Sequence, residues 1–232
     1  MKHCKKQGLC FTLILALILS MSIIPTNRAQ AAKAYTTHTI SHDTTIKGEK
    51  ATIELKCFYT YVALKGDTKI IRKINKALKP KNYKNYQSAA LEYAKSDADD
   101  RDNDDTYSDY TVQTVSYLSD SIVSVDETSV WYAGGVQNVA IGGRTFSLKT
   151  GNEIKKLTTV TKQKSLSKIK KTLKRLIKKQ DENYDTSELD KMKAKDFHFY
   201  ITKKGKVCVC FGPYELGFGG WTKKFYLASD NL

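Results

Sequence analysis

The stretch YTVQTVSYLSDSIVSVDETSVWYAGGVQNVAIGGRTFSL, residues 110–148, decides the fold class of this chain. It is rich in β-branched and aromatic residues, which favour strands. Turn signals divide it into three runs, the first at Ser119-Asp120-Ser121 and the second at the glycine break, Gly134-Gly135. The pattern predicts an antiparallel meander of three strands.

Further elements are predicted on both sides of the meander. Upstream, a threonine-rich arm at residues 36–45 leads to a strand at residues 51–62, and a helix capped by Asp67 continues until Pro80 stops it. A second, shorter helix is predicted over residues 86–95. Downstream, the sequence predicts a basic amphipathic helix at residues 165–180, a hairpin with its turn at residues 203–205 and a last strand at residues 223–227. We therefore expect an α+β fold in which two to three helices pack on antiparallel sheet.

The N-terminus has the pattern of a secretory signal peptide. Three lysines precede an apolar run at residues 9–24, and a small-residue pattern ends at Ala31. The run is short for a bilayer span, so we expect cleavage after Ala31 and a secreted protein, with an uncleaved anchor as the alternative. The predicted organisation is a signal peptide at residues 1–31 and one secreted domain at residues 32–232, with a strand and helix part at 32–109 and the meander, basic helix and hairpin at 110–232.

The predicted secreted domain is strongly basic. Cleavage removes four basic residues and no acidic residue, so the formal net charge falls from +15 to +11. Outside a cell, the obvious anionic partners are wall polymers such as teichoic acids, and phospholipid head groups, rather than nucleic acid.

The sequence contains no recognisable catalytic constellation. It has no GxSxG elbow, no phosphate-binding glycine pattern and no cysteine with an identifiable histidine partner. We accordingly expect a protein that is not an enzyme and that needs no cofactor. One alternative stays open, a wall-active hydrolase that uses Glu215 together with an acid from residues 97–109.

Seven aspartates gather in that acidic run, residues 97–109. Asp100, Asp102 and Asp104 reproduce the first three ligand spacings of an EF-hand. The next residue is an aspartate where that loop needs glycine, and Thr111 stands where it needs a bidentate glutamate. We expect a solvated acidic loop, with a weak cation site at the three aspartates as the alternative.

Three cysteines, Cys57, Cys208 and Cys210, lie outside the predicted signal peptide, and they permit at most one disulfide within the chain. Strand parity argues against a simple pairing within one sheet, because Cys57 shares a face with apolar neighbours that Cys208 and Cys210 do not share. Buried thiols are the expected state, and their redox state is left open.

The basic helix at residues 165–180 has two interpretations. Its apolar stripe could lie on a membrane surface, or it could be the buried face of a helix packed on a sheet, and we expect the second. In either case its cationic side chains form a basic surface, made of Lys168, Lys170, Lys171, Lys174, Arg175, Lys178 and Lys179.

Several motifs occur in an order that resembles a known domain type. They are YLSDSIVSV, the glycine break, FSLKTGNEIKKLTTV, the long helix, FHFYITKKGKVCVCF and PYELGFGGW. In this order they resemble the extracellular domain of the lysozyme-sensing anti-sigma-V factor (RsiV type). The same domain type accompanies the catalytic domain of PdaC-type peptidoglycan deacetylases. The resemblance covers most of residues 51–227.

The resemblance implies an RsiV-like α+β domain that acts outside the cell in recognition rather than catalysis. The chain departs from the family after the glycine break, where Val136-Gln137-Asn138 replaces the common Ala-His, and it is rich in glycine after PYEL. Lysozyme binding is the function that the resemblance suggests. Common lysozymes are basic, as is this domain, so long-range electrostatic repulsion argues against lysozyme binding.

Together these observations predict a secreted, non-catalytic recognition domain of a cell envelope that binds an anionic wall polymer or a wall-associated protein. A lysozyme-binding or lysozyme-inhibiting domain is the alternative. The expected ligand surface combines aromatics with polar groups that give direction, and consists of Tyr214, Glu215, Phe218, Trp221, Gln137 and Asn138. The opposite interpretation places Tyr214 and Trp221 in the core. Membrane contact is expected only through an uncleaved signal sequence or the basic helix.

Overall fold

The computed structural model describes residues 34–81 and 89–230. Its strands and helices lie in one compact unit, Tyr35–Leu232. The predicted signal peptide and its cleavage site fall outside the described residues. Among the helices that are described, none is long and apolar enough to cross a membrane.

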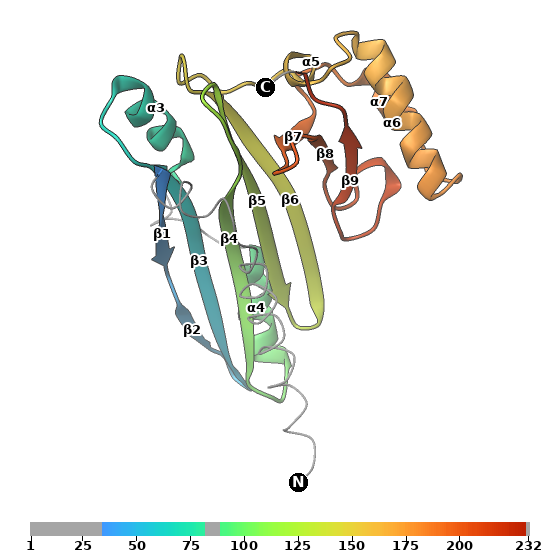
Figure 1. Cartoon of the computed structure of the whole chain (residues 1–232). Coiled ribbons are helices and arrows are strands. Elements are labelled where there is room, and N and C mark those ends of the chain that lie inside the picture. The colour runs from blue at the N-terminus through green and yellow to red at the C-terminus, as the bar shows by residue number, and fades with distance from the viewer. Residues whose placement is uncertain (1–33, 82–88, 231–232) are drawn as a thin grey trace. The chain divides into compact units, whose positions relative to one another are not determined.

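Six strands form the larger of two sheets (Figure 1). They are β1 (Tyr35–Ser41), β2 (Thr44–Lys47), β3 (Thr52–Leu64), β4 (Asp105–Leu118), β5 (Ile122–Ala133) and β6 (Val136–Ser147). Their order is β1-β3-β4-β5-β6, and β2 also pairs with β3. Strands β4, β5 and β6 pair antiparallel in sequence order, which confirms the predicted meander. The expected division at residue 109 falls inside β4.

Strands β3 and β4 pair in parallel, which the sequence did not predict. A parallel pair needs a crossover connection, and here the connection holds α3 (Lys69–Leu78) and α4 (Ala89–Asp100). Helix α3 packs in one cluster with Val115, and α4 packs in another with Tyr107. These two residues lie eight positions apart on β4 and therefore share a face. Both helices cover the same face of the sheet.

The start of α3 differs from the prediction by one residue. Thr68 caps the helix, because its hydroxyl accepts a hydrogen bond from the Ile71 N–H at 3.2 Å. Asp67, the predicted cap, instead pairs with Arg72. The predicted stop at Pro80 agrees with a helix that ends at Leu78.

Helix α4 corrects the prediction of a single acidic loop. The prediction placed this helix at residues 86–95, of which residues 86–88 lie outside the described part, but the helix continues to Asp100. Asp97, Asp99 and Asp100 are therefore helical. The buried face of α4 consists of the small residues Ala90, Ala94 and Ala98, which let the helix lie close to the sheet.

Gln113 ties the crossover to the sheet. Its side chain is buried, and its Nε2 donates hydrogen bonds to Tyr59 Oη at 3.0 Å and Glu127 Oε2 at 2.9 Å. Nε2 also donates to the Leu78 carbonyl at 3.1 Å, while Oε1 accepts from the Val62 N–H at 3.2 Å. One amide thus connects β3, β4, β5 and the C-terminal end of α3.

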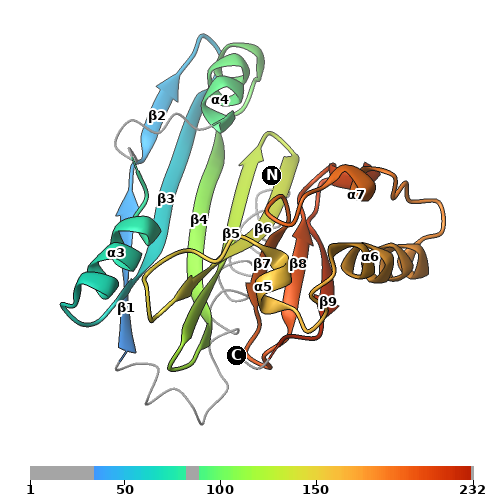
Figure 2. The same ribbon diagram turned by 90° about the horizontal axis from the view of Figure 1, so that it is seen from above.

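Three shorter strands form the second sheet, with α5 (Leu157–Val160), α6 (Leu166–Gln180) and α7 (Glu188–Lys191) preceding them in the chain. The strands are β7 (His198–Ile201), β8 (Val207–Phe211) and β9 (Lys223–Leu227), and they pair antiparallel in that order. The predicted hairpin, last strand and basic helix are confirmed. An apolar cluster joins one face of this sheet to Ile169, Leu173 and Ile177 of α6. Figure 2 shows α6 on the side of β7–β9 that faces away from the large sheet.

The other face of the small sheet meets β5 and β6. The Ile201 N–H donates to Ser124 Oγ at 2.8 Å. At Gly143 on β6, an added Cβ would lie 2.5 Å from Tyr200 Cβ and 2.7 Å from the Val125 carbonyl oxygen. The two sheets approach this closely because position 143 has no side chain.

A glycine pair on β6 tests this contact. We expect Gly143→Ala to destabilise the fold by about 1–3 kcal/mol, because the new methyl group overpacks the contact between the sheets. Gly142→Ala is the matched control, since a Cβ there meets nothing within 4 Å. The control should be neutral or stabilising by up to about 1 kcal/mol, because glycine weakens a strand interior. Urea unfolding of both variants measures the difference, and equal stabilities would contradict the close approach.

Candidate functional site

The segment between β8 and β9, residues 212–222, contains the short 3₁₀ turn Glu215–Gly217 and is here called the aromatic loop. Its C-terminal end follows the edge of β6, because the Val139 N–H donates to the Gly220 carbonyl at 3.3 Å. The Ile141 N–H also donates to Thr222 Oγ1 at 2.7 Å. The loop therefore uses hydrogen-bonding groups of an edge strand that would otherwise be exposed.

The structure brings part of the predicted ligand surface together. The side chains of Tyr214 and Trp221 are 67% and 58% exposed, so neither is a core residue. Asn138 on β6 is half-buried, and its Oδ1 is buried without a hydrogen-bond partner among the described residues. A Cβ added at Gly220 would lie 3.2 Å from Tyr214 Oη and 3.4 Å from Asn138 Oδ1, so these groups lie close to one another. Gln137, also half-buried, precedes Asn138 on the strand.

Phe218 was wrongly placed on that surface. It is 2% exposed and belongs to the apolar cluster of the small sheet. Its ring lies edge-on to Tyr184, with the ring centroids 4.5 Å apart, and also contacts Phe211 and Phe225. Glu215 is exposed, and its Oε2 accepts a hydrogen bond from the Gly212 N–H at 2.7 Å, so this carboxylate stabilises its own turn.

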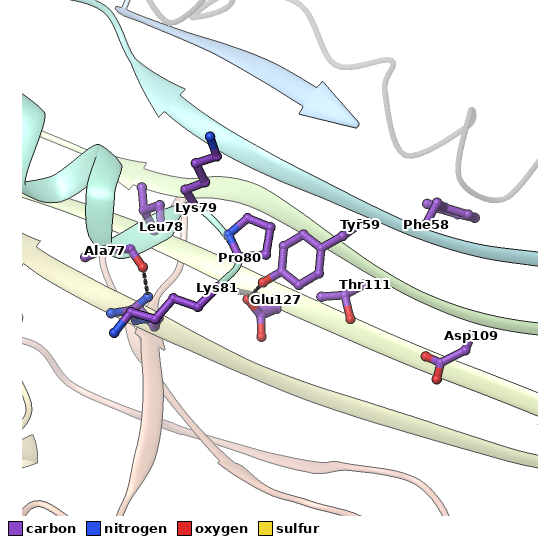
Figure 3. Close-up of a pocket in the computed structure, with 11 residues that line it drawn as sticks. Phe58, Tyr59, Ala77, Leu78, Lys79, Pro80, Lys81, Asp109, Thr111 and Glu127 are labelled. Carbon is purple, nitrogen blue, oxygen red and sulfur yellow. Dashed lines mark hydrogen bonds between the residues drawn. The ribbon is translucent and has the colours of Figure 1, made fainter. Parts of the chain in front are cut away.

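Two adjoining hollows lie on the face of the large sheet, and we call them together the sheet-face groove. The first has a volume of about 460 Å³ and extends from Tyr59 and Glu127 to the residues that follow α3 (Figure 3). The second has a volume of about 340 Å³ and ends at Tyr214 of the aromatic loop. The hollows adjoin because Asp109 and Thr111 line both.

Sequence reasoning missed the polar residues of the first hollow. Tyr59 donates to Glu127 Oε2 at 2.7 Å, and burial, followed by the nearby Glu127 charge, raises the pKa of Tyr59. Ionisable side chains on one face of neighbouring strands are the sequence signal that could have found these residues. Here they are Glu127 on β5 and Arg144 on β6.

Arg144, which lines this hollow, forms an ion pair with Glu153. Its Nε and Nη2 donate to the two carboxylate oxygens of Glu153 at 3.1 and 2.8 Å, and it also donates to the Ala77 carbonyl of α3. Burial acts to raise the pKa of Glu153, but the hydrogen bonds and the charge of Arg144 lower it below its usual value. The same hydrogen bonds raise the pKa of Arg144. The pair stabilises the fold by joining β6 to the segment that follows it.

The acidic run also has internal partners. Arg101 pairs with Asp97 at 3.0 Å and Asp105 at 3.8 Å, and Asp104 accepts a hydrogen bond from the Thr52 N–H at 2.7 Å. Within residues 34–81 and 89–230, no three His, Cys, Asp or Glu side chains lie close enough to hold a metal ion.

Helix α6 carries seven Lys or Arg side chains between Lys168 and Lys179. Lys174 pairs with Asp190 at 2.6 Å, and Lys170 and Lys178 donate to backbone carbonyls. Four other cations make no ion pair or side-chain hydrogen bond with any residue that the structure describes, and all are exposed: Lys168, Lys171, Arg175 and Lys179. Their i, i+3, i+7, i+11 spacing places them along one side of the helix. We call these four residues the cationic stripe.

No protein-family model and no curated protein matches the sequence. Among solved structures, a member of the DUF3298 family from Bacteroides fragilis matches with a TM-score of 0.54 at 12% identity, covering 84% of this chain and 91% of that one. The chain shares the fold of this DUF3298 protein. A DUF3298 family protein from Pseudomonas aeruginosa matches with a TM-score of 0.41 at 12% identity, over 83% and 90% of the two chains. DUF3298 proteins are RsiV- and PdaC-like domains, so the predicted α+β fold agrees with the resemblance.

Phe218 is buried whereas Tyr214 and Trp221 are exposed, so replacing them with alanine should affect the stability of the fold differently. Phe218→Ala removes a buried ring and should cost about 3–5 kcal/mol of unfolding free energy. Trp221→Ala and Tyr214→Ala remove exposed rings and should change it by less than about 1 kcal/mol. Urea unfolding measures all three, and a large loss in Trp221→Ala would mean that this ring is structural.

The lowered pKa of Glu153 predicts that the folded protein loses stability in acid. Because its pKa is lowered in the folded state, the ionised carboxylate stabilises the fold above the unfolded pKa, and this contribution disappears as the pH falls through the folded pKa. We expect Glu153→Gln to be less stable at neutral pH by about 1–2 kcal/mol and to lose less stability than the wild type between about pH 5 and about pH 3. Urea unfolding at several pH values tests this, and parallel pH profiles for the two proteins would contradict it.

Proposed function

We propose that this chain is a secreted, non-catalytic recognition domain of a cell envelope, and that the cationic stripe of α6 binds an anionic wall polymer such as a teichoic acid. The observation that carries the proposal is the stripe itself, because its four cations have no partner among the described residues. The net charge of +11 expected for residues 32–232 adds a long-range attraction to polyanions.

The geometry of α6 supports a repeating anionic ligand. Lys168 and Lys179 are eleven residues apart, so the stripe extends about 16 Å along the helix, with roughly one cation per turn. A polymer with regularly spaced phosphates offers a charge to each cation in turn, and lysine and arginine are both established phosphate ligands.

The helix is held rigidly enough to present that stripe. Its opposite face is buried through Ile169, Leu173 and Ile177, each 0% exposed. Because the helix is fixed by packing on the small sheet, little backbone freedom is lost when a ligand binds. This arrangement favours recognition in solution over insertion into a membrane, since the apolar face is already occupied.

A protein ligand at the aromatic loop is the second candidate, and the exposure of Tyr214 and Trp221 favours it. Exposed aromatic side chains are enriched at protein interfaces, and Tyr214 Oη lies near Asn138 Oδ1, which has no hydrogen-bond partner among the described residues. A wall-associated protein, or the lysozyme that the family resemblance suggests, would be such a ligand.

The hydrolase alternative has less geometric support. Glu215 lines neither hollow of the sheet-face groove, and its carboxylate is engaged by the Gly212 N–H. A glycosidase needs a second carboxyl group within about 5–9.5 Å of the first. Release of soluble fragments from purified peptidoglycan, abolished by Glu215→Gln, would overturn the non-catalytic proposal.

A binding experiment with cell walls tests the proposed polymer site. Each cation near an anionic surface contributes about 1 kcal/mol, so replacing all four with alanine should weaken binding on the order of 100- to 1,000-fold. The wild type should lose its binding when teichoic acid is stripped from the walls, and should weaken with added salt. Sedimentation with intact and stripped walls measures both effects.

A second quadruple variant separates the stripe from total charge. It replaces four exposed lysines that lie elsewhere, Lys47, Lys50, Lys69 and Lys76, and loses the same net charge. This control should keep most of the binding. If both variants lose binding equally, the binding is non-specific charge attraction and the cationic stripe is not a site. Binding to immobilised lysozyme but not to walls would support the aromatic loop as the binding surface instead.

A further inference from the structure

Two buried thiols lie side by side in the middle strand of the small sheet. Cys208 and Cys210 are 0% and 2% exposed, are not joined in a disulfide, and have their sulfur atoms 4.0 Å apart. Because side chains alternate along a strand, both point to the face of β8 opposite the α6 cluster. Ile141 of β6 packs against them.

A disulfide does not fit this geometry. Positions i and i+2 of a strand are separated by about 6.6 Å, and their Cβ atoms point in the same direction. A disulfide needs Cβ atoms about 3.5–4.5 Å apart. Strand β8 is also paired on both sides, from Val207 to Cys210 with β7 and from Val207 to Phe211 with β9, so it cannot bend to close that gap without breaking ladder hydrogen bonds.

A metal bridge does fit. With metal–sulfur bonds of about 2.3 Å, two sulfurs on one ion lie about 3.8 Å apart at a tetrahedral angle and about 4.6 Å apart when linear. The observed separation of 4.0 Å falls inside this range. Thiolate ligands select soft ions, and among biological metals Cu⁺ is the one for which two sulfur ligands suffice.

Tyrosines border the sulfur pair on both neighbouring strands. Tyr200 and Tyr226 lie opposite Cys208 on the neighbouring strands, so their side chains share its face of the small sheet.

Two charged groups face the pair from different strands. Lys224 on β9 stands opposite Cys210, and Asp126 of β5 is the strand partner of Gly143, which lies against Tyr200. A lysine and two tyrosines therefore lie next to the site where negative charge would collect.

We propose that Cys208 and Cys210 form a two-sulfur site for one soft monovalent cation, with Cu⁺ as the ion that fits best. Binding forms two metal–sulfur bonds and releases the two thiol protons to solvent, with no change in oxidation state. The resulting complex carries one net negative charge, next to Lys224 and the two tyrosines. The proposal does not depend on the function proposed for α6.

Competition titration tests the site on the chain from residue 32 onward, which contains the whole compact unit and leaves out Cys4 and Cys10. The reduced protein is titrated with Cu⁺ against a coloured chelator in the absence of oxygen. We expect one tightly bound ion per chain and a higher melting temperature when it is bound. Cys208→Ala or Cys210→Ala should weaken binding more than about 100-fold, since loss of even an outer partner costs about 10- to 100-fold.

Cys57→Ala is the matched control, because Cys57 is also a buried free thiol but lies in the large sheet. It should bind Cu⁺ as the wild type does. X-ray absorption of the copper-loaded wild type keeps the test independent of variant folding, and should show two sulfur neighbours. Binding that survives in Cys208→Ala, copper held by oxygen or nitrogen, or a Cys208–Cys210 disulfide in the air-exposed wild type detected by mass spectrometry would each overturn the proposal.

Discussion

The parallel pairing of β3 and β4 is the constraint on which the rest of the fold depends. Every other neighbouring pair in the large sheet is antiparallel, and such pairs close with short turns. The one parallel pair forces the chain to cross over the sheet, and both helices of the crossover settle on the same face. The opposite face of β5 and β6 is thereby left for the small sheet. Gln113 holds this arrangement in register, since its single amide joins both paired strands to the end of α3.

The sequence predicts local structure here much better than long-range pairing. The meander, the basic helix and the C-terminal hairpin follow from periodicity and turn residues, which act over a few positions. The direction of pairing between β3 and β4 depends on strands about forty residues apart, so no local pattern records it. The aromatic loop shows the same limit on a smaller scale. Phe218 and Trp221 lie three residues apart in a glycine-rich segment without a period, and one is buried while the other is exposed.

Helix α6 is packed on the small sheet, as its sequence predicts, and still presents charged side chains to solvent. An amphipathic helix is commonly either a packed element or a binding surface, and the two are often treated as alternatives. Here the apolar side is fully used in the core of the small sheet, which leaves the opposite side free to carry charge without loss of stability. The lysines that flank the core, Lys170 and Lys174, are tied to the chain near α7, whereas the cationic stripe points away from it. The packing of α6 therefore divides its cations into those that contact the rest of the chain and those that remain exposed to solvent.

The two faces of strand β8 also differ in chemical character, although the strand is only five residues long. Its valines and Phe211 lie on the α6 side and build an ordinary apolar core, whereas its two cysteines lie on the side toward the large sheet, among tyrosines and a lysine. Two alanines would serve a purely apolar contact at this position as well, without the cost of placing ionisable sulfurs beside Asp126. Gly143 brings β6 close enough to shield the pair from solvent, because it allows Tyr200 to approach the backbone. The close packing of the two sheets thus gives the fold its stability and also supplies the water-poor environment in which a thiolate is a strong ligand for a soft ion.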